Sequence, residues 1–530
     1  MEAAGDGGRL CGSGDRGRRV QGSQDPNAQL LDAGALVGHL VPDGSIYAFL
    51  AEHRHRLFPD AMFADLFPSR RGRPSTPPQV AATVMVLQSL EGLSDREAAE
   101  TLRCDIRWKV AAGLPLDHVG IHSTTLTYWR RRLGASDRPE RIFDAVRDVI
   151  SETGLLARST RRALDSTVLQ DAVATQDTVT QLVAQIRRVR KMVPAADEVE
   201  LEAHDYSQPG KPPCAWDDPA ARQVLVSGLV NDALRLLDVL EDVELQEGQQ
   251  QAVALLALVA GQDVEEGEEP GSWRIARRTA KDRVISTVDP TSRHVHKNRT
   301  SYTDGFKAHV SVEPDSGLVV AAALTAGNAP DGPTGVDLLE GEQQPVEVLA
   351  DSAYGSAETR IAIADAGHTT IIKPMPTRRL TKHPDAFTPA DFDIDTHAAT
   401  VTCPAGQTVP VSTAGAARFR SRCDGCPLRE RCTTSKNGKT VKVHQHHDVL
   451  AAARRQAEDP DWQDRYRQHR PMVERTITWL VRRGHRRVRY RGIDRNRLAL
   501  HHRAAAVNLQ RLLNLGLHHD AGRWALPAPG

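Results

Sequence analysis

The sequence contains no apolar stretch near the roughly 20 residues that a helix needs to cross a bilayer, and no membrane partner is expected. Residues 1–28 lack the apolar centre of a secretory signal peptide. Only seven of the 530 residues are cysteine, so without an export signal a disulfide framework is not expected. Basic and acidic residues balance at 68 each, and the total charge therefore identifies no partner. These absences favour a cytoplasmic protein of two or three domains.

Two common catalytic motifs are also missing. The nucleophile pattern Gly-x-Ser-x-Gly does not occur, and neither does the phosphate-binding pattern Gly-x-x-x-x-Gly-Lys-Ser/Thr. The first absence argues against hydrolases built around that serine turn. The second argues against an ATP-driven machine.

The charges are unevenly distributed although they balance. Acidic residues crowd into 195–270, whereas 470–503 is strongly basic, and a local basic stripe is what nucleic acid recognises. The patterns predict a disordered tail over 1–34, an all-α domain over 35–155, an α/β domain over 156–515 and a second tail over 516–530. Within the α/β domain we expect a helical insertion at about 172–285 and a cysteine-rich insertion at about 377–450.

Short helices separated by small turns are expected in the 35–155 domain. Ser94 and Glu97 have the spacing of a capping box, which opens a helix. A later helix, beginning at Ser123, carries Arg130 and Arg131. A final basic helix favours a helix-turn-helix-like module that contacts DNA, and the alternative is an ordinary bundle with a solvated arginine face.

In the α/β domain the apolar period becomes two, which is typical of strands. Strands are expected at 160–169, 306–312, 318–325, 346–350 and 369–373, with helices between the later ones. With the helical insertion set aside, this order is that of a ribonuclease-H-like mixed sheet, an antiparallel hairpin continued by parallel strands. In that fold the strands 160–169 and 346–350 lie side by side.

Three acidic residues stand at informative places in these elements. Asp165 interrupts the first strand, Asp351 ends the strand 346–350, and Glu474 lies on a helix over 470–480. A carboxylate on a core strand is costly unless it is paired or binds a cation. Glu474 shares a helix face with Ile477, so we expect it to point inward. Two carboxylates leaving strands and one on a helix can hold two divalent cations, which is the equipment for phosphodiester chemistry.

Each acid also has a plainer explanation. The alternatives are an ion pair with Arg161 or Arg162 for Asp165, a helix cap for Asp351, and a contact within the helix to Arg470 or Thr478 for Glu474.

Basic residues follow Glu474 closely. The stretch 482–492 holds six arginines with a tyrosine and two glycines, a composition suited to a phosphate backbone. The alternative is a solvated charged surface. The residues expected to contact DNA are Arg130, Arg131, Arg470, Arg475, Trp479, Arg482, Arg483, Arg486, Arg487, Arg489 and Arg491.

Four cysteines cluster late in the chain, namely Cys403, Cys423, Cys426 and Cys432. The Cys-x-x-Cys knuckle at 423–426 and the tight turn Cys-Pro-Ala-Gly at 403–406 match a closed structural zinc site with four thiolates. The alternative is reduced cysteines without a metal. The nearby histidines His444, His446 and His447 could substitute as ligands.

Taken in order, these stretches resemble the DDE transposases of bacterial insertion sequences, in the branch with a helical N-terminal domain and a cysteine-rich insertion. The resemblance covers about residues 35–515. It is carried by Leu-Asp-Ser-Thr at 164–167, Leu-Ala-Asp-Ser-Ala-Tyr-Gly at 349–355, Arg-Pro-Met-Val-Glu at 470–474, and the segments 72–78, 94–99, 302–309, 326–331, 403–406, 423–432 and 491–509.

The resemblance implies that Asp165, Asp351 and Glu474 match the acidic triad of a ribonuclease-H-like core. Related transposases carry the signature Tyr-x-x-Arg-x-x-x-Glu around the last acid. Here Arg470 fits the arginine position, but Arg467 stands at the tyrosine position, with Tyr466 one residue early, and Val481 stands where a basic residue is expected.

The expected function is cleavage of DNA at insertion-sequence ends and transfer of the strand into target DNA, with two Mg²⁺ (or Mn²⁺) ions at the triad. The zinc interpretation of the cysteine cluster adds a structural Zn²⁺. The partner is double-stranded DNA, in the bacterial cytoplasm and on the nucleoid, and the resemblance implies a homodimer or higher oligomer. The alternatives are a metal-dependent nuclease without strand transfer and an inactive DNA-binding relic or regulator.

Overall fold

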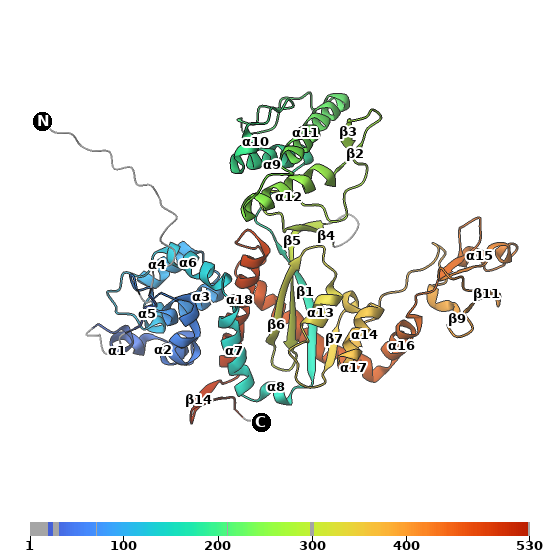
Figure 1. Ribbon diagram of the computed structural model, residues 1–530. Coiled ribbons are helices and arrows are strands. Elements are labelled where there is room, and N and C mark those ends of the chain that lie inside the picture. Colours follow the sequence, from blue (N-terminus) through green and yellow to red (C-terminus); the bar gives the residue numbers. More distant parts are fainter. Residues whose placement is uncertain (1–19, 25–30, 70, 209, 297–301, 528–530) are drawn as a thin grey trace.

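The computed structural model describes residues 20–24, 31–69, 71–208, 210–296 and 302–527. Figure 1 shows a central sheet flanked by helices, a group of N-terminal helices on one side, and two lobes that stand away from the sheet. Among the described residues, no helix has the length and apolar character needed to span a bilayer.

The central sheet has six strands and is mixed (Figure 1). β1 (Arg161–Gln170) runs antiparallel to β5 (Tyr302–Glu313) and parallel to β7 (Glu347–Ala350), and β8 (Thr369–Ile372) continues the sheet in parallel. β6 (Leu318–Ala326) and the short β4 (Arg293–His296) both pair with β5. This confirms the predicted ribonuclease-H-like fold and the pairing of 160–169 with 346–350. The sequence pattern did not predict β4.

Alternation along β1 sends its side chains into two different cores. Ala163 packs with apolar residues of α17 (Pro460–Val481) and α18 (Ile493–Asn514) on one face. Leu164 packs on the other face, with residues of α13 (Asp331–Asp337) and α14 (Ala357–Asp365). Asp165 therefore shares the face of α17, whereas Ser166 shares the face of α13.

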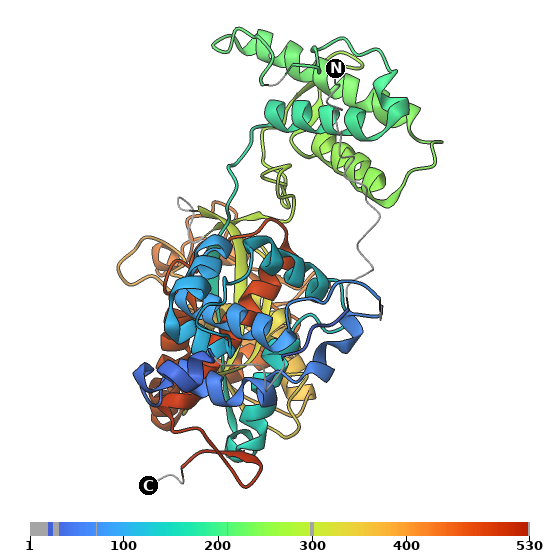
Figure 2. The same cartoon turned by 90° about the vertical axis from the view of Figure 1, so that its left-hand side faces the viewer.

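The N-terminal part is all-α. Its helices are α1 (Ala33–Val37), α2 (Ile46–Leu57), α3 (Pro78–Glu91), α4 (Asp95–Cys104), α5 (Ile106–Ala112), α6 (Ser123–Gly134), α7 (Arg141–Glu152) and α8 (Leu155–Arg158). The predicted capping box forms, because the Ser94 hydroxyl accepts from the Glu97 amide and the Glu97 carboxylate accepts from the Ser94 amide. Apart from α1, the N-terminal helices share one apolar core with α18, whose alanines 504–506 are fully buried. Figure 2 looks onto these N-terminal helices, coloured blue.

Each of the two outlying lobes has an apolar core of its own. The helical lobe consists of α9 (Thr178–Met192), α10 (Pro194–Asp197), α11 (Pro219–Val239) and α12 (Glu247–Gln262), with the hairpin β2 (Val264–Glu266) and β3 (Trp273–Ile275). The cysteine-rich lobe consists of β9 (Asp393–Asp395), β10 (Thr400–Thr402), β11 (Thr408–Pro410), β12 (Ala416–Arg418), α15 (Arg429–Cys432) and β13 (Thr440–Lys442). From it, α16 (His447–Glu458) leads back to α17 (Figure 1).

Parts of the segments expected to be tails are ordered. Asp32 caps α1, and the Gln24 side chain donates to the carbonyls that end α5. Near the C-terminus, β14 (His518–Asp520) and β15 (Arg523–Ala525) form a hairpin whose Trp524 packs edge-on against His53. The tail expectation is therefore wrong for 20–24, 31–34 and 516–527, because these residues find partners on the helical part. Residues 1–19, 25–30 and 528–530 lie outside the described residues.

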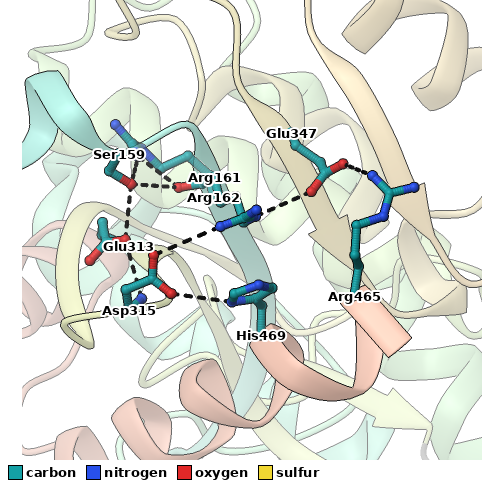
Figure 3. Close-up of polar contacts among 8 residues, drawn as sticks. All are labelled: Ser159, Arg161, Arg162, Glu313, Asp315, Glu347, Arg465 and His469. Carbon is teal, nitrogen blue, oxygen red and sulfur yellow. Dashed lines mark hydrogen bonds and ion pairs between the residues drawn. The ribbon is translucent and has the colours of Figure 1, made fainter. Parts of the chain in front are cut away.

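A polar network fixes the first half of α17 to the sheet (Figure 3). Glu347 at the start of β7 binds Arg161 of β1 and Arg465 of α17. One turn later along α17, His469 lies 3.2 Å from Asp315 in the β5–β6 turn. These contacts hold the helix that carries Glu474 in a fixed register against β1 and β7.

Candidate active site

Asp165 and Asp351 are neighbours across the β1–β7 pair. The parallel register ends with Ala163 opposite Leu349, and each acid follows two residues later, Asp351 just beyond the end of β7. The two carboxylates are near enough for the charge of Asp351 to raise the pKa of Asp165. Asp165 accepts a hydrogen bond from the Ser166 amide at 2.8 Å, and Asp351 accepts one from the Ala353 amide at 2.9 Å. Asp351 thus also caps the short 3-10 turn that follows it, as its plainer alternative proposed.

Burial makes the charge on Asp165 costly. Desolvation raises the pKa of the Asp165 carboxyl, Arg470 lowers it, and Asp351 raises it further, so that the pKa lies above its ordinary value. Arg161 and Arg162, the alternative partners, bind Glu347 and Glu342 instead. Asp165 therefore depends on a cation at the α17 face.

Arg470 supplies that cation. Its side chain is 6% exposed, and Nη2 lies 2.9 Å from Asp165 Oδ2. Burial works against the charge, but Asp165, Tyr466 and Asp351 more than offset it and raise the pKa of the guanidinium. Nε and Nη1 are buried and have no hydrogen-bond partner in the described part of the chain.

Glu474 lies at the open edge of this site. Its carboxylate is 3.8 Å from Arg470, which matches the alternative of a contact within the helix, but its side chain is 69% exposed. The expectation that Glu474 points inward is wrong, because Val473 and Ile477 occupy the buried side of α17. Among the described residues, no three His, Cys, Asp or Glu side chains are grouped closely enough to hold a metal ion as they stand.

Tyr466, rather than Arg467, faces the site. Tyr466 precedes Arg470 by one helical turn, and its ring stacks on Trp462 at 5.3 Å. Burial raises the pKa of the Tyr466 hydroxyl, and Arg470 lowers it. Arg467 is exposed and pairs with Asp464. The chain therefore supplies the tyrosine at a spacing of four residues from Arg470, where the related signature uses three.

A buried polar cluster that includes Lys307 and His309 lies on the opposite face of β1. Asp331, at the start of α13, is 3.1 Å from Lys307 Nζ and 3.3 Å from the Ser166 hydroxyl. Burial lowers the pKa of His309 to about 4. Tyr354 is fully buried in the same region, and burial and then the charges of Asp331, Asp165 and Asp351 raise the pKa of its hydroxyl.

We expect Tyr354→Phe to stabilise the protein by about 1 kcal/mol, because an unpaired buried polar group costs about 1–3 kcal/mol. The Tyr354 hydroxyl lies near enough to Ser166 for that side chain to lower its pKa, but it makes no hydrogen bond of normal geometry among the described residues. Thermal unfolding measures this change. A fall in Tm would instead reveal a partner for the hydroxyl. A rise in Tm accompanied by a loss of DNA cleavage would identify a group kept for the reaction at the expense of stability.

Several arginines expected to contact DNA join the N-terminal helices to the sheet domain. Arg483 donates to the carbonyl of Leu90, and Arg489 donates to that of Gly92, both at the end of α3. Arg130 pairs with Asp95 and lies over the Tyr490 ring. Arg486 and Arg487 donate to the carbonyls of residues 168 and 171, at the end of β1. The residues of the expected DNA-contacting set that are exposed to solvent are Arg131, Arg475, Arg482, Arg483, Arg486, Arg487, Arg489 and Arg491.

Two histidines at this junction, the buried His502 and the half-buried His485, give the protein a pH dependence. Burial, with Arg130 nearby, lowers the pKa of His502 to about 3, and burial with Arg503 and Arg489 does the same for His485. An unfolded histidine takes up its proton near pH 6.5. Each histidine therefore contributes stability that is complete above pH 6.5 and is lost as the pH falls toward 3, at about 1.4 kcal/mol per unit.

Between pH 6.5 and 5, the free energy of unfolding of the natural protein should fall as His502 resists protonation in the folded state. We expect the fall to be about 2 kcal/mol smaller in the His502→Gln variant, because glutamine takes up no proton. Urea unfolding at the two pH values measures this difference. Identical losses in both proteins would show that His502, which is 3% exposed, is protonated in the folded state.

The four cysteines line one cavity of the cysteine-rich lobe together with Phe419 and Lys439. The Lys439 amide donates to Cys423 Sγ at 3.4 Å. Burial raises the pKa of the Cys432 thiol, and the other three cysteines raise it further. The chain has thus gathered Cys403, Cys423, Cys426 and Cys432, although not in a geometry that holds an ion as it stands.

Two family models match the chain. The model described as Transposase domain (DUF772) matches residues 37–132, and the model described as Transposase DDE domain matches residues 402–513. The second match contains Glu474 and the basic stretch, whereas Asp165 and Asp351 lie outside both matches. No curated protein and no solved structure matches the chain. One match covers N-terminal helices, and the other includes α17 and nearly all of α18. Together they assign the chain to the DDE transposases of insertion sequences.

Proposed function

We propose that this transposase cleaves DNA at the ends of its insertion sequence and joins the released 3′-hydroxyl ends to target DNA, with Asp165, Asp351 and Glu474 as the catalytic acids. The observation that carries the proposal is the proximity of Asp165 on β1 and Asp351 just after the adjacent parallel strand β7, beside the helix of Glu474. Strand cleavage and joining both transfer a phosphoryl group, so one set of acids serves both steps.

DDE transposases use divalent metal ions, and the carboxylates here are of the kind that binds Mg²⁺ or Mn²⁺, although they would have to move closer together to hold an ion. Both aspartates offer hard oxygen ligands, and a guanidinium already lies against Asp165 as a stand-in cation. Asp165 and Asp351 would hold the ions from the sheet, and Glu474 would complete the site from α17. Two bound ions supply activation of the attacking oxygen and stabilisation of the leaving oxygen.

The DNA partner would lie along a basic surface formed in part by the C-terminal end of α17, the helix that carries Glu474. A groove between α2 and the ends of α17 and α18 is lined by Tyr47, Trp479, Arg482, Arg483 and Arg511, among others. The Arg511 guanidinium lies 5.4 Å from the centre of the Trp479 ring. Arginines combined with aromatic rings suit the phosphate backbone and exposed bases of DNA. Joining two element ends favours a homodimer or higher oligomer on the DNA.

The test of strand transfer uses purified protein, Mn²⁺ or Mg²⁺, and a labelled, pre-nicked element end with an unlabelled second duplex. We expect the label to appear in the longer joined product, and to be lost when EDTA is added. Cleavage of an intact end without any joined product would favour a nuclease. Binding of DNA without cleavage in either metal would favour an inactive regulator.

We also propose that the cysteine cluster binds a structural Zn²⁺, because its four thiols line one cavity. We expect the purified protein to contain about one zinc per chain by atomic absorption, and Cys423→Ser to abolish it. Cys104→Ser is the matched control, since Cys104 is exposed on α4, far from the cluster in sequence. Equal zinc contents in all three proteins, or none in any, would contradict the proposal.

A further inference from the structure

Arg470 lies among all three proposed catalytic acids. Its guanidinium binds Asp165 at 2.9 Å and lies 3.8 Å from Glu474, within the electrostatic field of Asp351. A divalent cation bound by Asp165 would therefore sit beside a fixed positive charge. Like charges at such distances repel strongly in a partly buried site. The ion pair of Arg470 and metal binding at Asp165 are thus in direct competition.

Arg470 is also incompletely bonded where it lies. Two other buried arginines in the same domain use several of their donors. Arg162 forms a bidentate pair with Glu342 and reaches Ser159, and Arg503 donates to the carbonyls of Ser89, Leu90, Trp479 and Leu480. Arg470 instead leaves Nε and Nη1 buried without a hydrogen bond in the described structure. An arginine with unpaired buried donors is suited to a second arrangement, in which an incoming anion binds them.

We propose that Arg470 is a displaceable counter-ion, which neutralises Asp165 until divalent cations bind and then turns its donors to a DNA phosphate. This inference rests on the proposed function, because it concerns the same acids. The charges explain why the two events belong together. Three carboxylates and Arg470 carry a net charge of about −2, so two divalent ions would leave a positive site that DNA phosphates restore toward neutrality.

The consequence is that metal and DNA each raise the affinity of the enzyme for the other. Without DNA, the ions must displace Arg470 into a position with no anion to receive it. With DNA, a phosphate receives the guanidinium and the carboxylates become available. Such coupling is reciprocal by thermodynamic linkage.

The experiment measures Mn²⁺ binding by calorimetry to the full-length natural protein, Arg470→Gln and Arg470→Lys, each with and without a double-stranded DNA oligonucleotide. Arg467→Gln is the matched control, since Arg467 lies on the same helix but is exposed and pairs with Asp464. We expect Arg470→Gln to bind Mn²⁺ at least about tenfold more tightly than the natural protein without DNA. DNA should tighten Mn²⁺ binding to the natural protein by a similar factor and have little effect on Arg470→Gln.

Arg470→Lys retains the charge and should bind Mn²⁺ as weakly as the natural protein without DNA. The inference is overturned if Arg470→Gln binds Mn²⁺ no more tightly than the natural protein. It is also overturned if DNA leaves the Mn²⁺ affinity of the natural protein unchanged, a measurement that needs no variant to fold. Failure of every protein to bind Mn²⁺, with or without DNA, would overturn the proposed two-cation site itself, and this inference with it.

Discussion

Replacing Asp351 by asparagine will lower the rate of DNA cleavage by at least about 10³-fold while leaving the fold intact. Asparagine has nearly the same shape, and its side-chain oxygen can still accept the hydrogen bond that Asp351 takes from the Ala353 amide. The variant therefore keeps the turn after β7 and loses only the negative charge. Cleavage of labelled element ends in Mg²⁺, followed over time, measures the effect.

Glu358→Gln serves as the control for Asp351→Asn. Glu358 is an exposed acid in the first turn of α14, close in sequence to Asp351 but outside the site. The Glu358→Gln variant should cleave DNA at the rate of the natural protein. DNA binding by Asp351→Asn, measured by gel shift, should remain close to natural. Natural cleavage by Asp351→Asn would remove Asp351 from the catalytic acids and leave the proposed mechanism without its central pair.

Replacing Glu342 by alanine will cost about 3–5 kcal/mol of unfolding free energy, because it leaves a buried arginine without its partner. Arg162 is 2% exposed, and its Nη2 lies 2.7 Å from Glu342 Oε2. The pair joins β1 to the segment before β7, and so holds together the two strands that carry the catalytic aspartates. Urea unfolding at neutral pH measures the loss.

Two comparisons sharpen this prediction. Asp464→Ala breaks an exposed pair with Arg467 and should cost less than about 1 kcal/mol. The double variant Arg162→Met with Glu342→Leu should recover most of the stability lost in Glu342→Ala, because apolar residues of similar volume replace buried ion pairs well. A loss of stability in Glu342→Ala no larger than in Asp464→Ala would show that water reaches Arg162.

The sheet was predictable because its information is local. The apolar alternation of β5, the apolar run of β6, the turn at Gly317 and the run that ends at Asp351 each lie within a few consecutive residues. The order of elements then placed β1 beside β7, and so Asp165 beside Asp351. β4 escaped prediction because it is four residues long and pairs with only the first residues of β5.

The surroundings of the acids were less predictable, because their partners are distant in the sequence. Periodicity on α17 placed Glu474 with Ile477, but the sheet and the N-terminal helices decide which side of that helix is covered, and Glu474 is left exposed. Asp331 became a candidate for the polar cluster only through its contacts with Lys307 on β5 and Ser166 on β1. The composition of 482–492 suggested DNA contacts, but it could not reveal that Arg483 and Arg489 donate to the carbonyls at the end of α3.

Those arginine contacts make the N-terminal helices and the catalytic core a single mechanical unit. The end of α3 receives hydrogen bonds from the loop after α17, and α18 is buried between the two parts. A catalytic fragment that begins near residue 156 would expose the apolar face of α18 and leave the arginines of that loop without their acceptors. The two transposase segments therefore cannot be exchanged between relatives as separate modules. The interface between the N-terminal helices and the catalytic core must be inherited, or redesigned, as a whole.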